Sequence, residues 1–149
     1  MKLKLAKPTR KALEKHNTMI EDIIDFVKNG FTWEVLGEIP SMKNDLRISR
    51  RGGFYHKDNA VKKYKQSFAW QTPAKFRMEI IRPVVVTTVI FMKDRRKDCH
   101  NLQAVIFDSL EAAGVICNDR QIVKWNGEAL IDRENPRVVI TVKEIEGMK

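Results

Sequence analysis

The fold is decided by the stretch Asp94-Arg95-Arg96-Lys97-Asp98-Cys99-His100-Asn101-Leu102, which separates a predicted strand from a predicted helix. Before it lies the apolar run Val84–Met92, which is rich in β-branched residues and is typical of a buried central strand. After it, residues 101–113 place apolar side chains at helical spacing. The sequence therefore predicts a strand, a polar loop, and a helix that packs back against that strand.

A second polar stretch, Asn118-Asp119-Arg120-Gln121, follows soon after Gly114 ends the predicted helix. An acidic residue at a strand exit, a polar residue two positions later, and an acidic residue after the returning helix can converge on one point. We therefore expect Asp98, His100 and Asp119 to lie together. Oxygen ligands from side chains of this kind hold divalent cations in proteins, so the two stretches predict a cation site.

Length and composition limit the class of protein. The chain has 149 residues and 43% hydrophobic residues, which indicates one folded domain and excludes a disordered chain. No apolar run is long enough to cross a membrane, and the start Met1–Ala6 is too short for a secretory signal. With only Cys99 and Cys117, no disulfide framework is expected, so a cytoplasmic setting is the default.

The charge balance favours a polyanionic partner. Lys and Arg number 28 against 19 Asp and Glu, which gives a net charge of +9. Such a balance usually indicates nucleic acid, although a merely soluble basic protein is the alternative. One basic cluster spans residues 43–65 and contains Gly52-Gly53-Phe54-Tyr55, which predicts a loop lying over a phosphate backbone. The residues expected to contact DNA are Lys43, Arg47, Arg50, Arg51, Lys57, Arg96 and Lys97.

Hydrophobic periodicity predicts the remaining elements. They are a helix over Arg10–Lys28 with a break near His16-Asn17-Thr18, strands over Phe31–Ile39, Phe76–Ile81 and Val84–Phe91, a helix over Asn59–Trp70, a strand over Gln121–Trp125 closed by a tight turn at Asn126-Gly127, and a last strand over Arg137–Ile145. We divide the chain into a basic N-terminal arm, residues 1–30, and a main domain, residues 31–149. The arm could be a packing helix, a basic arm or a dimer contact.

A set of motifs runs from about Trp33 to Val142. The motifs are Val35-Leu36-Gly37-Glu38-Ile39-Pro40, Gly52-Gly53-Phe54-Tyr55, Asp98-Cys99-His100-Asn101-Leu102-Gln103-Ala104, Asp108-Ser109-Leu110, Gly114-Val115-Ile116 and Asn118-Asp119-Arg120-Gln121-Ile122. In order and spacing they resemble the RusA family of Holliday junction resolvases, which are usually found in phages and prophages.

The resemblance implies an α+β fold, with one domain whose mixed β-sheet packs against helices, and a homodimer. It also implies a Mg²⁺-dependent endonuclease of DNA recombination and repair that nicks two strands of a four-way DNA junction symmetrically. The family's metal-binding carboxylates map onto Asp98, His100 and Asp119, its catalytic lysine maps onto Ala104, and Asn118 replaces the first aspartate of an Asp-Asp pair. These departures leave open a branched-DNA-binding protein that has lost efficient cleavage.

The residue types at the site suggest which cation it takes. Mg²⁺ prefers oxygen ligands, whereas an imidazole such as His100 suits Mn²⁺ or other transition metals better. His100 could instead be a general acid or base. Asp98 and Asp119 could simply be a helix cap and a turn residue. The residues expected to support the ligands from behind are Asn101, Asp108 and Asn118.

A zinc site made of Cys99, His100, Cys117 and Asp119 is a further alternative. The residue types are suitable for zinc. However, an adjacent Cys-His pair and a lone Cys-x-Asp depart from the paired-cysteine spacing of common structural zinc sites. Cys117 is therefore better explained as a small buried residue.

Overall fold

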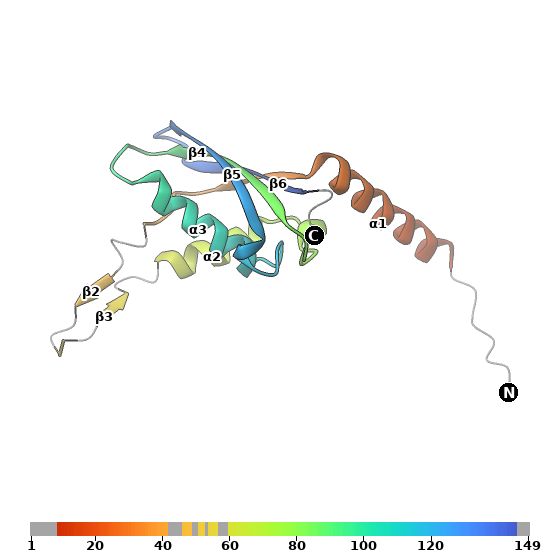
Figure 1. Cartoon of the computed structure of the whole chain (residues 1–149), viewed down its shortest axis with the longest axis horizontal. Helices are drawn as coiled ribbons and strands as arrows, with labels where there is room; N and C mark the ends of the chain where they lie inside the picture. The colour runs from red at the N-terminus through yellow and green to blue at the C-terminus, as the bar shows by residue number, and fades with distance from the viewer. Residues whose placement is uncertain (1–8, 42–45, 49–50, 53, 57–59, 146–149) are drawn as a thin grey trace.

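A four-stranded mixed sheet forms the centre of the molecule (Figure 1). The computed structural model describes residues 9–41, 46–48, 51–52, 54–56 and 60–145. The sheet contains β1 (Phe31–Leu36), β6 (Arg137–Glu144), β4 (Val84–Met92) and β5 (Ile122–Ile131), in that spatial order. β6 pairs antiparallel with β1 and β4, whereas β4 and β5 are parallel. The predicted α+β class with a mixed sheet is confirmed.

Two helices, α2 (Ala60–Gln71) and α3 (Cys99–Ala112), cover one face of the sheet (Figure 1). Along β4, every second side chain is buried and the others are half-buried, because only one face meets the helices. Phe68 of α2 and Leu102, Ile106 and Leu110 of α3 fill the space between the layers. The predicted helices over Asn59–Trp70 and Asn101–Ala113 are confirmed to within two residues at each end.

The unit β4–α3–β5 positions the candidate site. Val84, at the start of β4, is the register partner of Ile122, at the start of β5, and Met92 is the partner of Ile131 at the other end. Both strands therefore begin at one end of the sheet and finish at the opposite end. The loop that carries Asp98 leaves the end of β4, whereas the short 3₁₀ turn η2 (Asp119–Gln121) comes just before the start of β5.

The predicted tight turn at Asn126-Gly127 is wrong. β5 runs without interruption from Ile122 to Ile131, and Gly127 lies opposite Thr88 of β4. A Cβ added at Gly127 would lie 3.0 Å from Oε1 of Gln103 on α3. The glycine therefore makes room for a helix side chain instead of a turn, and pairing along the whole of β4 overrides the local turn preference.

The predicted strand over Phe76–Ile81 is also wrong. Residues Ala74–Phe76 form the 3₁₀ turn η1, and Glu79 has a φ of +49°, which interrupts an extended chain. Only a single parallel bridge remains, between Ile80 and Ile116.

The N-terminal helix α1 (Arg10–Asn29) is continuous and extends away from the sheet (Figure 1). Its predicted span is confirmed, and the break near residues 16–18 is not observed. The division into an arm and a main domain stays a prediction. β1 ends at Leu36, short of the predicted Ile39. Within the basic stretch, β2 (Leu46–Ile48) pairs antiparallel with β3 (Phe54–His56). Among the described residues, no helix has the length and apolar character needed to span a bilayer.

Gly30, which joins α1 to β1, should not tolerate a side chain. Its φ is +77°, and an added Cβ would lie 2.7 Å from the carbonyl oxygen of Val142. Gly30→Ala should therefore lower the free energy of unfolding by about 2–3 kcal/mol, through backbone strain and a clash. Gly52→Ala is the matched control in a urea titration, because its φ is +82° and no atom lies within 4 Å of the added Cβ. An equal loss in both variants would rule out the clash.

Candidate cation site and nucleic-acid interface

Asp98 begins α3 as its N-cap. Its backbone is extended, and its Oδ1 accepts a hydrogen bond of 3.0 Å from the backbone nitrogen of His100. The first backbone N–H groups of a helix have no partner within the helix, so a carboxylate here satisfies one of them. The capping role expected as an alternative for Asp98 is therefore present. It occupies one carboxylate oxygen and fixes the side chain close to the first turn of α3.

Three ligand-type side chains gather at this helix start. One ligand atom each from Asp98, Cys99 and His100 lies within 4.8 Å of the others, and all three residues are exposed. The cluster thus contains a carboxylate, a thiol and an imidazole. We call it the Asp-Cys-His cluster. Asp98 and His100 were expected to lie together, whereas Cys99 was expected only in the zinc alternative with His100, Cys117 and Asp119, so its position beside Asp98 was not predicted.

A groove of about 150 Å³ opens beside the Asp-Cys-His cluster, between α3 and β5. Its lining includes Cys99, His100 and Gln103 from α3 and Trp125, Gly127 and Glu128 from β5. Gln103 is only 9% exposed, and its Nε2 has no hydrogen-bond partner. Neither Gln103 nor Glu128 was predicted as a site residue from the sequence. The spacing of His100 and Gln103, three residues apart on one helix, was the available signal for Gln103.

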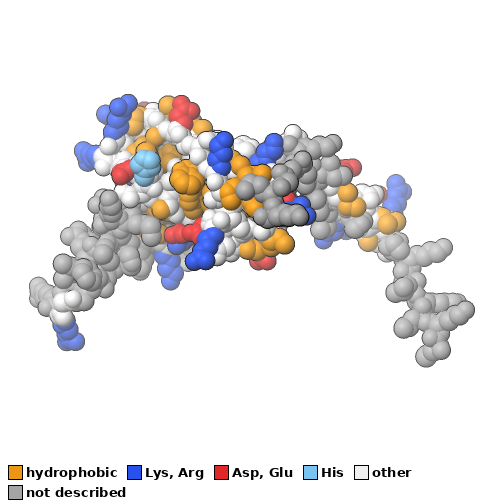
Figure 2. Space-filling model, viewed as in Figure 1, with side chains coloured by type: hydrophobic (Ala, Val, Ile, Leu, Met, Phe, Trp, Pro, Cys, Tyr) orange, Lys and Arg blue, Asp and Glu red, His pale blue; other side chains and the backbone are white. Residues whose placement is uncertain are grey.

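The loop before the cluster is anchored by Lys97. Its Nζ donates to Oε1 of Glu38 at 2.8 Å and to the carbonyl oxygen of Ile39 at 2.9 Å, and its side chain is 25% exposed. Arg96, in contrast, is 89% exposed and lies 3.6 Å from Asp94. Figure 2 shows Lys and Arg side chains at the end of the molecule where this loop lies. The structure thus favours a structural role for Lys97 and leaves Arg96 accessible to a phosphate.

Asp119 lies in a hydrogen-bonded 3₁₀ turn beyond the C-terminal end of α3. Its backbone nitrogen donates to Oε2 of Glu111 at 3.3 Å. Asn118 caps the turn by accepting from the nitrogen of Arg120 at 2.8 Å. The Gln121 side chain accepts from the nitrogen of Cys117 and donates to the carbonyl oxygen of Arg82, at 2.8 and 3.0 Å. Gln121 therefore fixes the position of Asp119, a role that the sequence did not reveal.

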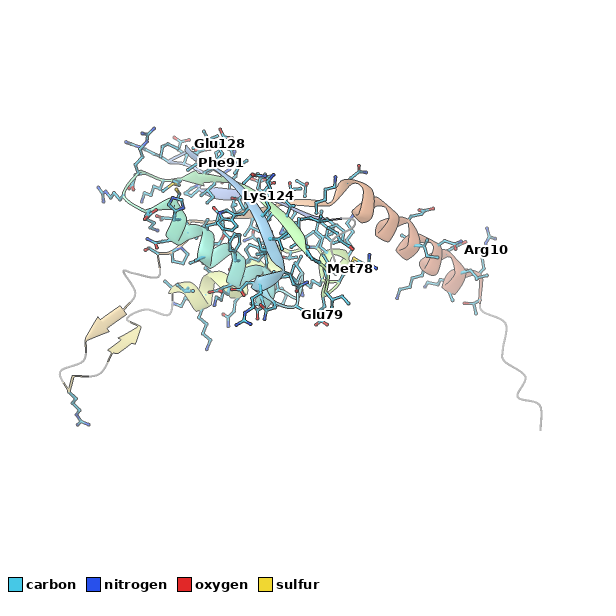
Figure 3. All side chains as sticks on the ribbon, viewed as in Figure 1. Arg10, Met78, Glu79, Phe91, Lys124 and Glu128 are labelled. Carbon is cyan, nitrogen blue, oxygen red and sulfur yellow. The ribbon has the colours of Figure 1, made fainter. Side chains whose placement is uncertain are left out.

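The expected convergence of Asp98 with Asp119 in one chain is wrong. Asp98 is the N-cap of α3 and Glu111 lies in its last turn, which places these two residues roughly 20 Å apart at 1.5 Å per residue. β4 also separates the two aspartates, because its 9 residues span the distance between the Asp98 end and the Asp119 end of the sheet. Figure 3 shows Phe91 and Glu128 near one end of the sheet and Met78 and Glu79 near the other. Cys117 is exposed, so the expected buried position is wrong. Its Sγ donates to the carbonyl oxygen of Glu79, which places Glu79 at the Asp119 end of the sheet.

Comparison with known proteins assigns the chain to a family. The sequence model of the family described as Endodeoxyribonuclease RusA matches residues 39–143. The chain belongs to the RusA family. It is also similar to the crossover junction endodeoxyribonuclease RusA of Aquifex aeolicus (strain VF5), with 26% identity over 113 residues, which cover 74% of this chain and 90% of that protein.

In the mapping that the resemblance implies, the chain departs from the RusA motif at three positions that the structure describes, which are His100, Ala104 and Asn118. His100 stands where the motif has an aspartate, and it lies in the Asp-Cys-His cluster. Ala104 stands where the motif has a lysine, and it is exposed on α3. At position 104 this chain therefore supplies no lysine charge.

The other residues expected near the ion lie elsewhere. Asp108 sits in the middle of α3 and pairs with Lys65 of α2 at 3.8 Å, so it does not support Asp98. Asn118 supports Asp119 instead, as the cap of its turn. Asn101 lies in the first turn of α3 and is half-buried. The alternative zinc site is wrong for a single chain, because Cys99 and His100 are separated from Cys117 and Asp119 by the length of α3.

The basic cluster of residues 43–65 is described only in part. Lys43, Arg50 and Lys57 lie outside the described residues, and for Arg47 only the strand is described. Arg51 is exposed between β2 and β3. The assignment of these residues to DNA contacts stays a prediction.

Two shifted pKa values occur outside the site. Burial raises the pKa of Tyr64 far above its usual range. A hydrogen bond from Arg137 is the main cause that lowers the pKa of Asp132. Arg137 also contacts Glu34 at 2.9 Å, so this group holds the ends of β1 and β6 together and has no direct link to the Asp-Cys-His cluster.

Proposed function

We propose that the chain is a structure-selective endodeoxyribonuclease that resolves four-way DNA junctions, as a cytoplasmic homodimer that depends on a divalent cation. The observation that carries the proposal is the position of Asp98 and His100. The chain belongs to the RusA family, and we map both residues onto the metal ligands of the family's motif; they lie together at the exposed start of α3. The net charge of +9 favours a DNA partner.

The residues fit a divalent cation. Oδ1 of Asp98 is held by the helix start, which leaves its second carboxylate oxygen for a cation, and the imidazole of His100 lies beside it. A bound divalent ion would supply charge neutralisation at the phosphate and activation of a water molecule. Asp98 and His100 would hold that ion, and Lys97 keeps their loop in place through Glu38.

A homodimer would complete the site. Asp119 cannot reach the ion held by Asp98 of its own chain, because α3 separates them. β5 is an edge strand of the sheet, and it exposes Val123, Trp125, Leu130 and Ile131. A long, apolar edge strand readily pairs with another strand. A second copy that pairs antiparallel along β5 would bring its Asp119 to the Asp98 end of the first copy.

This arrangement suits the reaction. A two-fold symmetric dimer would have two equivalent sites, each with Asp98 and His100 from one copy and Asp119 from the other. Two equivalent sites are what symmetric nicking of two strands requires. Pairing along β5 would therefore explain both why the two aspartates lie far apart in one chain and how one dimer could cut two strands.

One observation favours a second function. Ala104 is exposed where the RusA motif has a lysine, so this chain cannot place that positive charge beside the phosphate. A branched-DNA-binding protein on the same fold, with cleavage lost or weakened, is the alternative. Incubation of the protein with a labelled four-way junction, with Mg²⁺ and Mn²⁺ in parallel, distinguishes the two. Paired nicks support the enzyme. Tight junction binding without nicks in these metals or in Zn²⁺ or Co²⁺ supports the alternative.

The basic cluster of residues 43–65 should set the salt dependence of binding. If Arg50 and Arg51 contact phosphates, replacing both by alanine should weaken junction binding and reduce the slope of log K against log salt by about 2. Fluorescence anisotropy at several salt concentrations measures the slope. Replacement of Arg10 and Lys11 by alanine is the matched control, because it removes the same charge from α1. An unchanged slope in the Arg50/Arg51 variant would place the DNA elsewhere.

A further inference from the structure

We infer that the Asp-Cys-His cluster binds a borderline transition-metal ion of the Zn²⁺ class in preference to Mg²⁺, with the thiol of Cys99 as a ligand. The inference deepens the proposed function, because the same site would use the ion for cleavage. Ion binding itself can be tested without DNA.

The geometry of the cluster is close to that of a three-ligand site. Zinc bound by sulfur and nitrogen at about 2.3 and 2.0 Å holds these two donors about 3.5 Å apart. The donor atoms of Asp98, Cys99 and His100 lie within 4.8 Å of one another. All three residues are exposed, so rotations of their side chains can close the remaining distance. Three protein ligands also leave a coordination position open, which is the arrangement of catalytic zinc sites.

The donor set determines which ion is preferred. Mg²⁺ requires oxygen donors in octahedral geometry, and of the three residues only Asp98 supplies oxygen. Imidazole and thiolate are softer donors that suit Zn²⁺, Co²⁺ and similar ions. His100 alone moves the preference from Mg²⁺ toward Mn²⁺, and the adjacent Cys99 moves it further. The preference for a transition metal therefore follows from His100, which replaces a motif carboxylate, and from its neighbour Cys99.

Gln103 gives an independent indication that a ligand belongs here. It lies about one helical turn after Cys99 and His100 and lines the same groove. Its side-chain nitrogen is buried without an acceptor, which is costly unless something in the groove accepts its hydrogen. A water molecule or a carboxylate held by an ion in the cluster would be such an acceptor. Partners of this kind orient the groups around a metal and strengthen its binding.

Co²⁺ tests the thiol directly. The full-length protein, reduced and freed of metal, is titrated with Co²⁺ in the absence of DNA. A thiolate bound to Co²⁺ gives a charge-transfer band in the near ultraviolet, and Zn²⁺ should displace Co²⁺ and remove the band. We expect the band in the wild type and in Cys117→Ser, and its loss in Cys99→Ser. Cys117→Ser is the matched control, because Cys117 is the other exposed cysteine and lies at the opposite end of α3.

Two further variants refine the test. His100→Asp should shift the binding preference back toward Mg²⁺, because it restores an oxygen donor. Gln103→Met should keep the band but weaken Zn²⁺ binding by about 10- to 100-fold, since it removes only a supporting donor. Circular dichroism confirms that each variant is folded.

The inference is overturned if the wild type shows no band, or if Cys99→Ser keeps it. Removal of the band by excess Mg²⁺ would overturn the preference. The proposed function fails differently, when no divalent ion supports nicking of a four-way junction. A Cys99-dependent band in a protein that does not nick would keep the metal site and reject the nuclease.

Discussion

Asp98→Asn should abolish the nicking of four-way junctions and leave junction binding intact. The substitution removes the carboxylate of the Asp-Cys-His cluster and keeps the helix cap, since asparagine caps a helix about as well as aspartate. Loss of charge stabilisation by the cation, at about 4 kcal/mol, lowers the nicking rate about a thousandfold. Binding should be unchanged or slightly tighter, because a negative charge beside the phosphates is gone. Single-turnover nicking and anisotropy measure the two effects.

Asp94→Asn is the matched control for this experiment. Asp94 lies in the same loop, and its carboxylate accepts from the nitrogen of Arg96 at 2.9 Å instead of joining the Asp-Cys-His cluster. It should retain nicking close to that of the wild type. Full nicking by Asp98→Asn, with Mg²⁺ or Mn²⁺, would show that Asp98 is a helix cap and nothing more.

The elements that the sequence predicted well are those whose local pattern agrees with their tertiary setting. The β-branched run of β4 lies in the middle of the sheet, and α3 buries its predicted apolar stripe against it. Asn126-Gly127 shows the opposite case. Its turn preference is local, whereas pairing with β4 depends on residues far away in the sequence. No pattern around Gly127 alone could reveal that Gln103 would approach it from α3.

The position of the two aspartates depends on strand direction, which the sequence did not supply. A helix that joins two parallel strands carries the chain from the C-terminal end of the first strand back to the N-terminal end of the second. Residues just before and just after such a helix therefore lie at opposite ends of the strands. The sequence predicted β4, α3 and part of β5, but not that β4 and β5 are parallel. The contacts that fix Asp119, through Glu111 and Gln121, likewise require the folded arrangement.

An inactive Asp98→Asn protein mixed with an inactive Asp119→Asn protein should regain nicking. In the proposed homodimer, each site takes Asp98 from one copy and Asp119 from the other. A mixed dimer therefore contains one site with both substitutions and one site with both native aspartates. If subunits exchange at random, about half of the dimers are mixed, and each has one working site. The expected signal is about a quarter of the wild-type rate of first nicking.

The products of the mixture give a second, sharper criterion. One working site per dimer cuts one strand of the junction, so nicked junctions should accumulate, whereas the wild type should yield paired cuts in one binding event. Denaturing and native gels of the same samples separate the two products. Subunit exchange is allowed by briefly unfolding and refolding the mixed proteins, and each variant treated alone is the control. If each site used both aspartates of one chain, every site in every mixed dimer would lack one of them. No nicking in the refolded mixture, with dimers present by light scattering, would therefore reject the shared site. The separation of Asp98 from Asp119 by the length of α3 would then indicate that one of the two takes no part in holding the cation.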